Sequence, residues 1–505
     1  MRKEIIKYLM VGFVLIGAGC TDLEVKEKDS VVIDDGEFSG VPMPGALITS
    51  YADLRAQSQH ENMYAIQEAT TDEIFIPTRG TDWGDNGVWR SLATHQWSPS
   101  HLFIRNAWNE LNSNVYRTNQ ILHPATTKTA LEEAEAKFLR AFNMYQILDI
   151  WRKIPFREAD EGAEIDPRVL EPAEAITFIE KDLTEALTEL PDAVPGGNLN
   201  RATKAAAHFL LGKLYLNKHV YLGQATADAA DMDNVITHVN ALTAAGFSLH
   251  EDYFGIFKGE KDEGETLTGN SGDSETIFSS DAGTGNRIFS GLHYTQNGWN
   301  GFATTAEFYA KFEGPDDGTN EPGDGQEERR GFVPEDGLGL GFLIGPQYGE
   351  DGEPLLARSG QQLAYTKEVP TLTGNSDVTG VRVLKYLPDY GAHFVFYRYA
   401  DAFLMKAEAL FRKGDPESAT SMVNDLRTFR NATAFDGVIT EQQLLDERGR
   451  ELYTEGWRRS DMIRFGVYNT QFGFNTVTDE TRNIMPIPDV AVASNPNLQQ
   501  NPGYE

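Results

Sequence analysis

The 505-residue chain contains only one cysteine, Cys20, so no disulfide can form within a single molecule. Basic residues are scarce too, because 44 Lys and Arg stand against 76 Asp and Glu and leave a formal net charge of −32. Nucleic acids are bound by basic surfaces that release the counterions condensed on the phosphates. The acidic balance therefore argues against nucleic acid as a partner and against side-chain binding to an anionic membrane surface.

The sequence also lacks the motifs that carry catalytic chemistry. It has no H-E-x-x-H zinc motif and no cluster of Cys and His ligands. Residues 269–272 (Gly-Asn-Ser-Gly) are not a nucleophile elbow, which needs G-x-S-x-G between a strand and a helix. With 76 acidic residues, the sequence does not exclude a pair of carboxylates for glycoside hydrolysis, but no particular pair is marked by its spacing. We therefore expect a protein that is not an enzyme.

The sequence has one short hydrophobic run, at the N-terminus, and no long hydrophobic run after it. Three basic residues among the first seven precede an uncharged, mostly apolar stretch at 8–19, too short to span a bilayer as a mature helix. The small residues before Cys20 are typical of a bacterial lipoprotein processing site, with Gly17 standing where leucine is usual. We predict a signal peptide at 1–19, acylation of Cys20, and a lipid anchor and tether at 20–40. The alternative is an ordinary signal peptide with a coincidental cysteine.

Helical periodicity is strong in two blocks that flank an irregular middle. Residues 131–154 contain no Gly or Pro, and their large apolar side chains recur at three- and four-residue spacing on one helix face. Leu211–Tyr215 reads L-G-x2-Y, the core of a tetratricopeptide helix, and such helical hairpins stack their apolar faces. Further helices are predicted at 172–190, 201–219, 397–412 and 417–430. We expect a mostly α, tetratricopeptide-like scaffold of helical hairpins.

Between the helical blocks, residues 255–352 hold 21 of the 47 glycines and show no helical period. This composition indicates loops and few short strands built onto the helical frame. A calcium site needs hard oxygen ligands, and this region offers them at Asp316, Asp317, Asn320, Glu321 and Asp324. Their spacing is not that of an EF-hand. We favour a solvated acidic loop, with calcium as the weak alternative and no other metal or cofactor expected.

Several motifs, in order along the chain, resemble the SusD family (SusD/RagB), the surface glycan-binding lipoproteins that partner TonB-dependent transporters. They are Lys137–Trp151 with Ile154–Phe156, Ile179–Leu183, Arg201–Ala207, Arg398–Ala409, Val423–Arg427, Glu447–Gly456, Arg464–Gly466, Met485–Pro488 and Asn501–Tyr504. The resemblance runs from Cys20 to Tyr504 and is weakest at 255–390. It departs from the family pattern at Arg152-Lys153, where glycine or aspartate variants usually follow the tryptophan.

The resemblance implies a single SusD-like domain at 41–505. Its parts would be an N-terminal helical part (41–220), an irregular ligand-loop region (221–395) and a C-terminal helical part (396–505). It also implies a non-catalytic protein that binds a neutral oligosaccharide or polysaccharide, and that is anchored by its N-terminal lipid on the outer membrane at the cell surface. The implied partner is a SusC-like TonB-dependent transporter. Two alternatives stay open: a surface-anchored glycoside hydrolase and a peptide-capturing member of the same scaffold.

The family-like residues at 440–456 are of the types that stabilise a fold. Thr440 and Gln443 have the spacing of a capping box at a helix start. The helix that follows carries charges at pairing distance, namely Glu447, Arg448, Arg450 and Glu451. We interpret these charges as ion pairs that hold helices together.

Two Gly- and Asp-rich loop segments, 72–97 and 287–302, carry the residue types that bind sugars. Sugar rings stack on Trp or Tyr, and polar side chains bind their hydroxyls. We predict a platform of Trp83 and Trp299, and the full set of candidate contacts is Trp83, Trp299, Tyr294, Asp72, Asp82, Arg79, Arg287 and Asn300. SusD-like proteins place their glycan platform on corresponding loops. The remaining tryptophans are expected in the core, namely Trp89, Trp97, Trp108, Trp151 and Trp457.

The anchor assignment gives the first prediction. Replacing Cys20 by Ala should move the protein out of the outer-membrane fraction, because a lipid on Cys20 is the only membrane attachment that the sequence suggests. Fractionation of cells that lack the transporter partner measures this. Co-sedimentation of the variant with the outer membrane in those cells would contradict the assignment.

Overall fold

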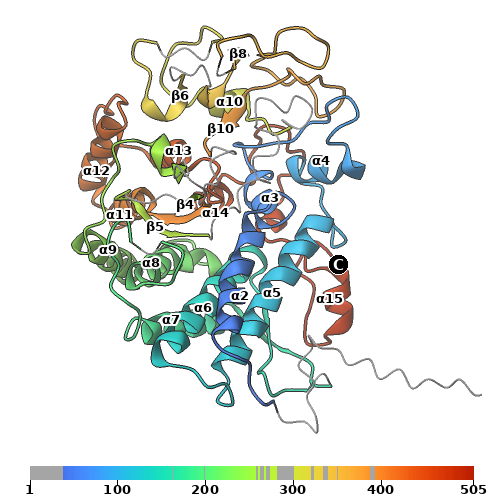
Figure 1. Cartoon of the computed structure of the whole chain (residues 1–505), viewed down its shortest axis with the longest axis vertical. Helices are drawn as coiled ribbons and strands as arrows, with labels where there is room; N and C mark the ends of the chain where they lie inside the picture. Colours follow the sequence, from blue (N-terminus) through green and yellow to red (C-terminus); the bar gives the residue numbers. More distant parts are fainter. Residues whose placement is uncertain are drawn as a thin grey trace, which may run out of the picture. The chain divides into compact units, whose positions relative to one another are not determined.

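Pairs of contacting helices form the frame of residues Gly40–Glu505, which make up one compact unit (Figure 1). In Figure 1 the pairs from the first half of the chain lie at the bottom, and the yellow segments of the irregular middle lie at the top. The long helices are α5 (Leu102–Leu122), α6 (Ala130–Trp151), α7 (Pro172–Ala186), α8 (Lys204–Tyr221), α9 (Ala229–Ala244), α11 (Tyr399–Arg412), α12 (Pro416–Phe429) and α13 (Glu441–Leu452). The predicted mostly helical scaffold is confirmed.

The computed structural model describes residues 38–505 apart from 163, 198, 258–259, 262–266, 269–272, 281–300, 320–322, 334–338, 350 and 387–392. The predicted signal peptide and Cys20 lie outside the described residues. The same is true of four candidate sugar contacts: Arg287, Tyr294, Trp299 and Asn300. Within the described part of the chain, no helix has the length and hydropathy to cross a membrane.

Local signals in the sequence fix where the helices begin. Capping boxes open α6, at Thr129 and Glu132, and α13, at Thr440 and Gln443 as predicted. Proline stands at the start of α7 and α12, where its missing N–H costs nothing. The predicted helices are found within a few residues, but α7 ends at Ala186 instead of continuing to residue 190. No bounds were predicted for helices α5 and α9.

Shorter elements connect the frame. The short helices are α2 (Gly45–Asp53), α3 (Met63–Glu68), α4 (Val88–Ala93), α10 (Ala306–Tyr309), α14 (Arg458–Arg464) and α15 (Asp489–Ser494). All strand pairs of the described residues are antiparallel. They are β1 (Ile154–Phe156) with β2 (Arg168–Leu170), β3 (Glu260–Lys261) with β4 (Leu267–Thr268), β5 (Thr276–Ser279) with β11 (Val395–Arg398), β8 (Gly345–Pro346) with β9 (Ala364–Tyr365), and the sheet β10–β7–β6 (Arg382–Leu384, Leu340–Leu343, Gly331–Phe332).

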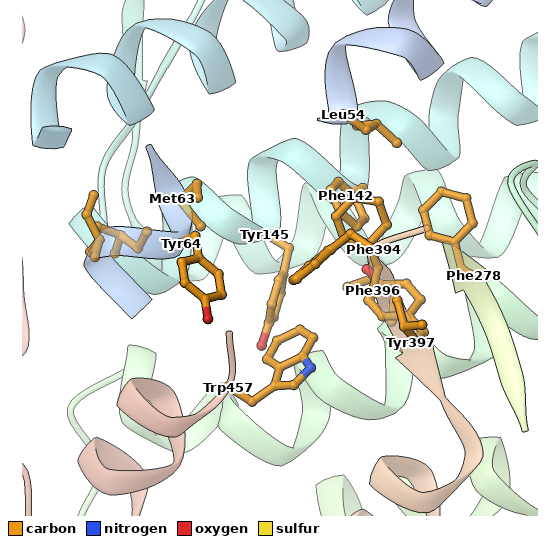
Figure 2. Close-up of a cluster of buried hydrophobic side chains, with 14 of the residues drawn as sticks. Leu54, Met63, Tyr64, Phe142, Tyr145, Phe278, Phe394, Phe396, Tyr397 and Trp457 are labelled. Carbon is orange, nitrogen blue, oxygen red and sulfur yellow. The ribbon is translucent and has the colours of Figure 1, made fainter. Parts of the chain in front are cut away.

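An aromatic cluster packs α6 against the β5–β11 pair (Figure 2). The Phe142 ring lies 5.2 Å from Phe396 and 5.9 Å from Phe278, measured between ring centroids. Each buried aromatic side chain removes a large apolar area from water, and edge-to-face pairs add to this. The five tryptophans expected in the core are buried as predicted.

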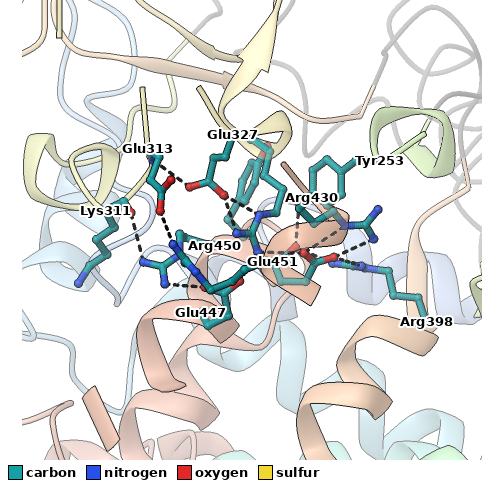
Figure 3. Close-up of polar contacts among 12 residues, drawn as sticks. Tyr253, Lys311, Glu313, Glu327, Arg398, Arg430, Glu447, Arg450 and Glu451 are labelled. Carbon is teal, nitrogen blue, oxygen red and sulfur yellow. Dashed lines mark hydrogen bonds and ion pairs between the residues drawn. The ribbon is translucent and has the colours of Figure 1, made fainter. Parts of the chain in front are cut away.

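A buried network of arginines and glutamates joins the irregular middle to the C-terminal helices (Figure 3). The Glu451 carboxylate on α13 lies 3.1 Å from Arg329, 2.8 Å from Arg398 and 3.1 Å from Arg430, and all four side chains are fully buried. Burial alone would raise the pKa of Glu451, but the three guanidinium groups hold it well below its ordinary value. One carboxylate therefore ties together α13, β11, the end of α12 and the segment before β6.

The network extends from Glu451 in both directions. Glu275, just before β5, lies 2.6 Å from Arg398 and 3.0 Å from Arg430. One turn earlier on α13, Glu447 binds arginines 2.6–2.7 Å away, namely Arg329, Arg427 and Arg450. Arg448 binds Asp401 and Asp461, each at 2.8 Å. The predicted role of these charges as ion pairs between helices is confirmed.

The network predicts a large stability effect. Glu451→Ala should lower the free energy of unfolding by about 3–5 kcal/mol, because it leaves three buried arginines without their shared carboxylate. Urea unfolding followed by circular dichroism measures the change. Glu441→Ala on the same helix is the control, since its side chain is largely exposed and 4.0 Å from Arg412, and it should cost less than about 1 kcal/mol. Equal effects of the two variants would refute the importance of the network.

Candidate functional site

The described parts of the two predicted sugar-binding segments lie next to each other. Phe75 and Ala303 exchange backbone hydrogen bonds of 2.8 and 3.0 Å, and the Arg79 guanidinium donates to the Gly301 carbonyl at 3.2 Å. A third segment joins them, because Arg79 also donates to the Ser376 carbonyl at 3.0 Å. We call residues 72–90, 301–305 and 355–382 the loop junction. The structure thus brings together segments more than 200 residues apart in the sequence.

Trp83 lies inside the loop junction and not on its surface. Only 9% of the residue is exposed, and its ring centroid lies 5.5 Å from Phe302 and 6.0 Å from Trp89. A Cβ atom at position 301 would come within 2.2 Å of the Trp83 ring, so only glycine fits there. The expectation that Trp83 lies outside the core is wrong, because Phe302, distant in sequence, and the nearby Trp89 cover it.

The backbone around Trp83 is strained. Trp83, Asp85 and Asn86 have φ angles of 59°, 37° and 53°, in the left-handed region that favours glycine. Each such residue costs on the order of 1–3 kcal/mol and persists only where surrounding contacts hold it. One such contact is the 3.0 Å hydrogen bond from the Trp89 indole N–H to the Asp85 carboxylate. Strain of this kind is concentrated at binding sites, which supports a functional role for the loop junction.

Asp72 and Arg79 hold the loop junction from inside. Asp72 accepts two hydrogen bonds of 2.7 Å from the Arg458 guanidinium, which anchors the first segment to α14. Arg79 is buried among backbone carbonyls, and this burial lowers its pKa well below the ordinary value. Neither side chain is open to a ligand in this arrangement. Both therefore position the loops, a role that differs from the direct sugar contact predicted for them.

Asp82 is the described candidate that reaches the surface. Its side chain is 31% exposed and forms an ion pair with Arg358, whose side chain is 49% exposed. Sequence reasoning missed Arg358, because it lies 276 positions from Asp82 and no local motif marks it. The pair places a carboxylate and a guanidinium side by side at the rim of the loop junction, where both can bind sugar hydroxyls.

Two of the residues considered as calcium ligands, Asp316 and Asp317, form contacts with other residues of the protein. Asp316 is paired with Lys367 at 2.7 Å, and Asp317 accepts the backbone N–H of Thr319 at 3.1 Å. Asp324 is exposed, whereas Asn320 and Glu321 lie outside the described residues. Among the side chains that the structure describes, no group of three His, Cys, Asp or Glu could hold a metal ion.

Comparison with known proteins gives the family. A model of the SusD family matches residues 389–504, and a model described as "Starch-binding associating with outer membrane" matches residues 45–216. Together they cover more than half of the chain. The chain belongs to the SusD family. Its membership makes it an outer-membrane-associated protein of a non-catalytic family, in agreement with the prediction that it is not an enzyme.

Relatives of the whole chain support the assignment. The starch-binding protein SusD of Bacteroides thetaiotaomicron is 26% identical, and the comparison covers 100% of both chains. A crystal structure of a SusD-like protein from Bacteroides fragilis matches with a TM-score of 0.67 at 19% identity, covering 93% of this chain and 98% of that one. A laminarin-binding SusD-like protein matches with a TM-score of 0.59 at 20% identity, covering 91% and 98%. The two structures establish that the fold is shared over nearly the full length.

Two buried carboxyl groups adjoin the first segment of the loop junction. Glu68 accepts the Gly456 N–H at 2.5 Å, and Glu73 accepts the Thr454 N–H at 3.1 Å. Burial raises the pKa of Glu68 to about 7, and burial together with the neighbouring Glu68 raises the pKa of Glu73 well above its ordinary value. The two groups hydrogen-bond to each other when one of them is protonated. The folded protein therefore holds a proton there that the unfolded chain releases near pH 4–5.

This pair predicts a stability that falls with rising pH. Because the folded pKa of Glu68 lies above its unfolded value, the contribution of Glu68 is complete below about pH 4 and is lost as the pH rises through about 7. Glu68→Gln keeps the hydrogen-bonding shape but cannot ionise. The loss of unfolding free energy between about pH 5.5 and about pH 8.5 should therefore shrink by about 1–3 kcal/mol in the variant.

Urea unfolding at several pH values measures this difference. Glu480→Gln is the control, since Glu480 is exposed and the variant should follow the wild-type pH profile. A Glu68→Gln profile parallel to the wild type would show that the pair is not protonated in the folded state.

Proposed function

We propose that the protein is a non-catalytic, cell-surface glycan-binding lipoprotein that captures oligosaccharide or polysaccharide and passes it to a SusC-like TonB-dependent transporter. The proposal rests on family membership and on a full-length relationship to a protein named for starch binding. The observation that carries the choice of site is the meeting of the two predicted sugar-binding segments in one loop junction. Attachment through an acylated Cys20 and exposure at the cell surface are parts of the same proposal.

In this proposal the sugar binds at the rim of the loop junction. Trp299 and Asn300 directly precede Gly301, and the sequence predicts Trp299 as the aromatic platform. Asp82 and Arg358 supply hydroxyl partners at the described surface. Buried Trp83 supports the loops from below instead of stacking on the sugar. Since Arg358 is already paired with Asp82 and the chain carries a net charge of −32, we expect a neutral glycan.

Affinity electrophoresis with starch and laminarin tests the proposal. Trp299→Ala should weaken retardation about tenfold or more, because one stacked ring contributes on the order of 1–3 kcal/mol and about 1.4 kcal/mol is a factor of ten. Its melting temperature should stay at the wild-type value. Arg358→Ala should weaken retardation as well, through the lost hydroxyl contact.

Trp83→Ala is the matched comparison for the platform residue. It should lower the melting temperature, because truncating a buried aromatic residue costs about 3–5 kcal/mol. If both Trp299→Ala and Arg358→Ala were retarded as strongly as the wild type, the sugar site would lie outside the loop junction. Binding of peptide mixtures without any glycan would favour a peptide-capturing protein. Release of new reducing ends that a single Asp or Glu substitution abolishes would favour a glycoside hydrolase.

A further inference from the structure

A separate cavity of about 480 Å³ lies between α5 and α15, which lie side by side on the right of Figure 1. Pro155 of β1, Arg157 just after it, Pro167, Asn495 and Leu498 complete its wall. None of its lining residues belongs to the loop junction. Cavities of 300–1,000 Å³ are typical of small-ligand sites, so the size is sufficient for a short sugar.

One face of α5 supplies an aromatic and amide wall to this cavity. Trp108, Asn112 and Tyr116 are spaced by four residues and therefore lie on the same side of the helix. Trp108 is only 4% exposed, and its ring packs edge-on against Trp151 at 5.2 Å. Tyr116 is half-buried. A cluster of rings and amides in a concave site has the chemistry that binds sugar rings.

The cavity also collects unused hydrogen-bonding groups. Asn112 donates its amide N–H to the Trp108 carbonyl at 2.8 Å, which leaves its Oδ1 acceptor buried without a partner. The Nε donor of Arg157 is likewise buried without a partner. Unpaired buried polar groups each cost about 1–3 kcal/mol, so these two atoms in one cavity favour a bound ligand.

The pattern of unpaired groups selects the ligand chemistry. Oδ1 of Asn112 needs a donor, whereas Nε of Arg157 needs an acceptor. A hydroxyl group is both donor and acceptor, so the hydroxyls of one ring can serve both groups. Of the side chains that line the described cavity, none is a carboxylate and Arg157 alone is charged. A neutral, hydroxyl-rich ring with apolar C–H faces therefore fits best.

We propose that this cavity is a second carbohydrate subsite that takes a monosaccharide or disaccharide unit, independent of the site at the loop junction. The proposal shares its sugar chemistry with the proposed function but uses different residues. Half-buried Tyr116 contacts an apolar face of the ring, Asn112 and Arg157 bind its hydroxyls, and buried Trp108 supports the floor of the cavity. Two separated subsites on one chain would hold a glycan at two points, which increases its retention.

The test uses the full-length protein in detergent, with maltose, laminaribiose and xylobiose as probes and saturation-transfer NMR as the measurement. Ala491→Trp places a large side chain into the cavity from α15 and should weaken disaccharide binding at this subsite at least tenfold. Val490→Trp is the matched control, because Val490 neighbours it on the same helix, is 59% exposed and does not line the cavity. Asn112→Leu removes the unpaired acceptor at nearly constant volume and should weaken binding about tenfold. Melting curves confirm that each variant folds.

Combining these changes with Trp299→Ala separates the two sites. In the Trp299→Ala background, disaccharide binding should persist and should then be lost with Ala491→Trp but kept with Val490→Trp. If the Trp299→Ala protein binds no disaccharide, or if Ala491→Trp and Val490→Trp bind equally, the second subsite is refuted. Retardation by starch or laminarin in the Ala491→Trp protein reports on the loop junction alone, so failure of one site does not conceal the other.

Discussion

The meeting of three arginines at Glu451 is the interaction on which the rest of the molecule depends. Helical hairpins bury their apolar faces by stacking on one another, but the glycine-rich middle of the chain has too little regular structure to do so. The ion pairs of Arg329, Arg398 and Arg430 fasten that middle to α13 and to the end of α12. Buried ion pairs are a poor source of net stability, since desolvation offsets their attraction. Their contribution here is geometric, because opposite charges in an apolar interior tolerate few alternative partners.

The loop junction is also held in a fixed geometry, by a buried ion pair and by hydrogen bonds. Its first segment is bound to α14 by Asp72 and Arg458, and its three segments are bound to each other by Arg79. Strained residues such as Asn86 can be held because their surroundings are rigid. For the proposed glycan site, a rigid base of this kind would spare part of the entropic cost of binding.

Features encoded by neighbouring residues could be predicted from the sequence, whereas features that need distant partners could not. The capping box at Thr440 and the pair of Glu447 with Arg450 depend on residues a few positions away, and both were predicted. The burial of Trp83 depends on Phe302, and the exposed ion pair of Asp82 depends on Arg358. Composition around Trp83 indicated an open loop, since nothing local shows which distant ring covers it. The cavity beside Trp108 was missed for the same reason, because its opposite wall comes from residues near the C-terminus.

The contact between Gly301 and the Trp83 ring has a consequence for mutations in the loop junction. A side chain at position 301 could be accommodated only by displacing the Trp83 ring. Because that ring also packs against Phe302 and Trp89, its displacement would disturb the packing of both. A single added methyl group at position 301 would therefore loosen the interior of the junction without touching any of its exposed side chains.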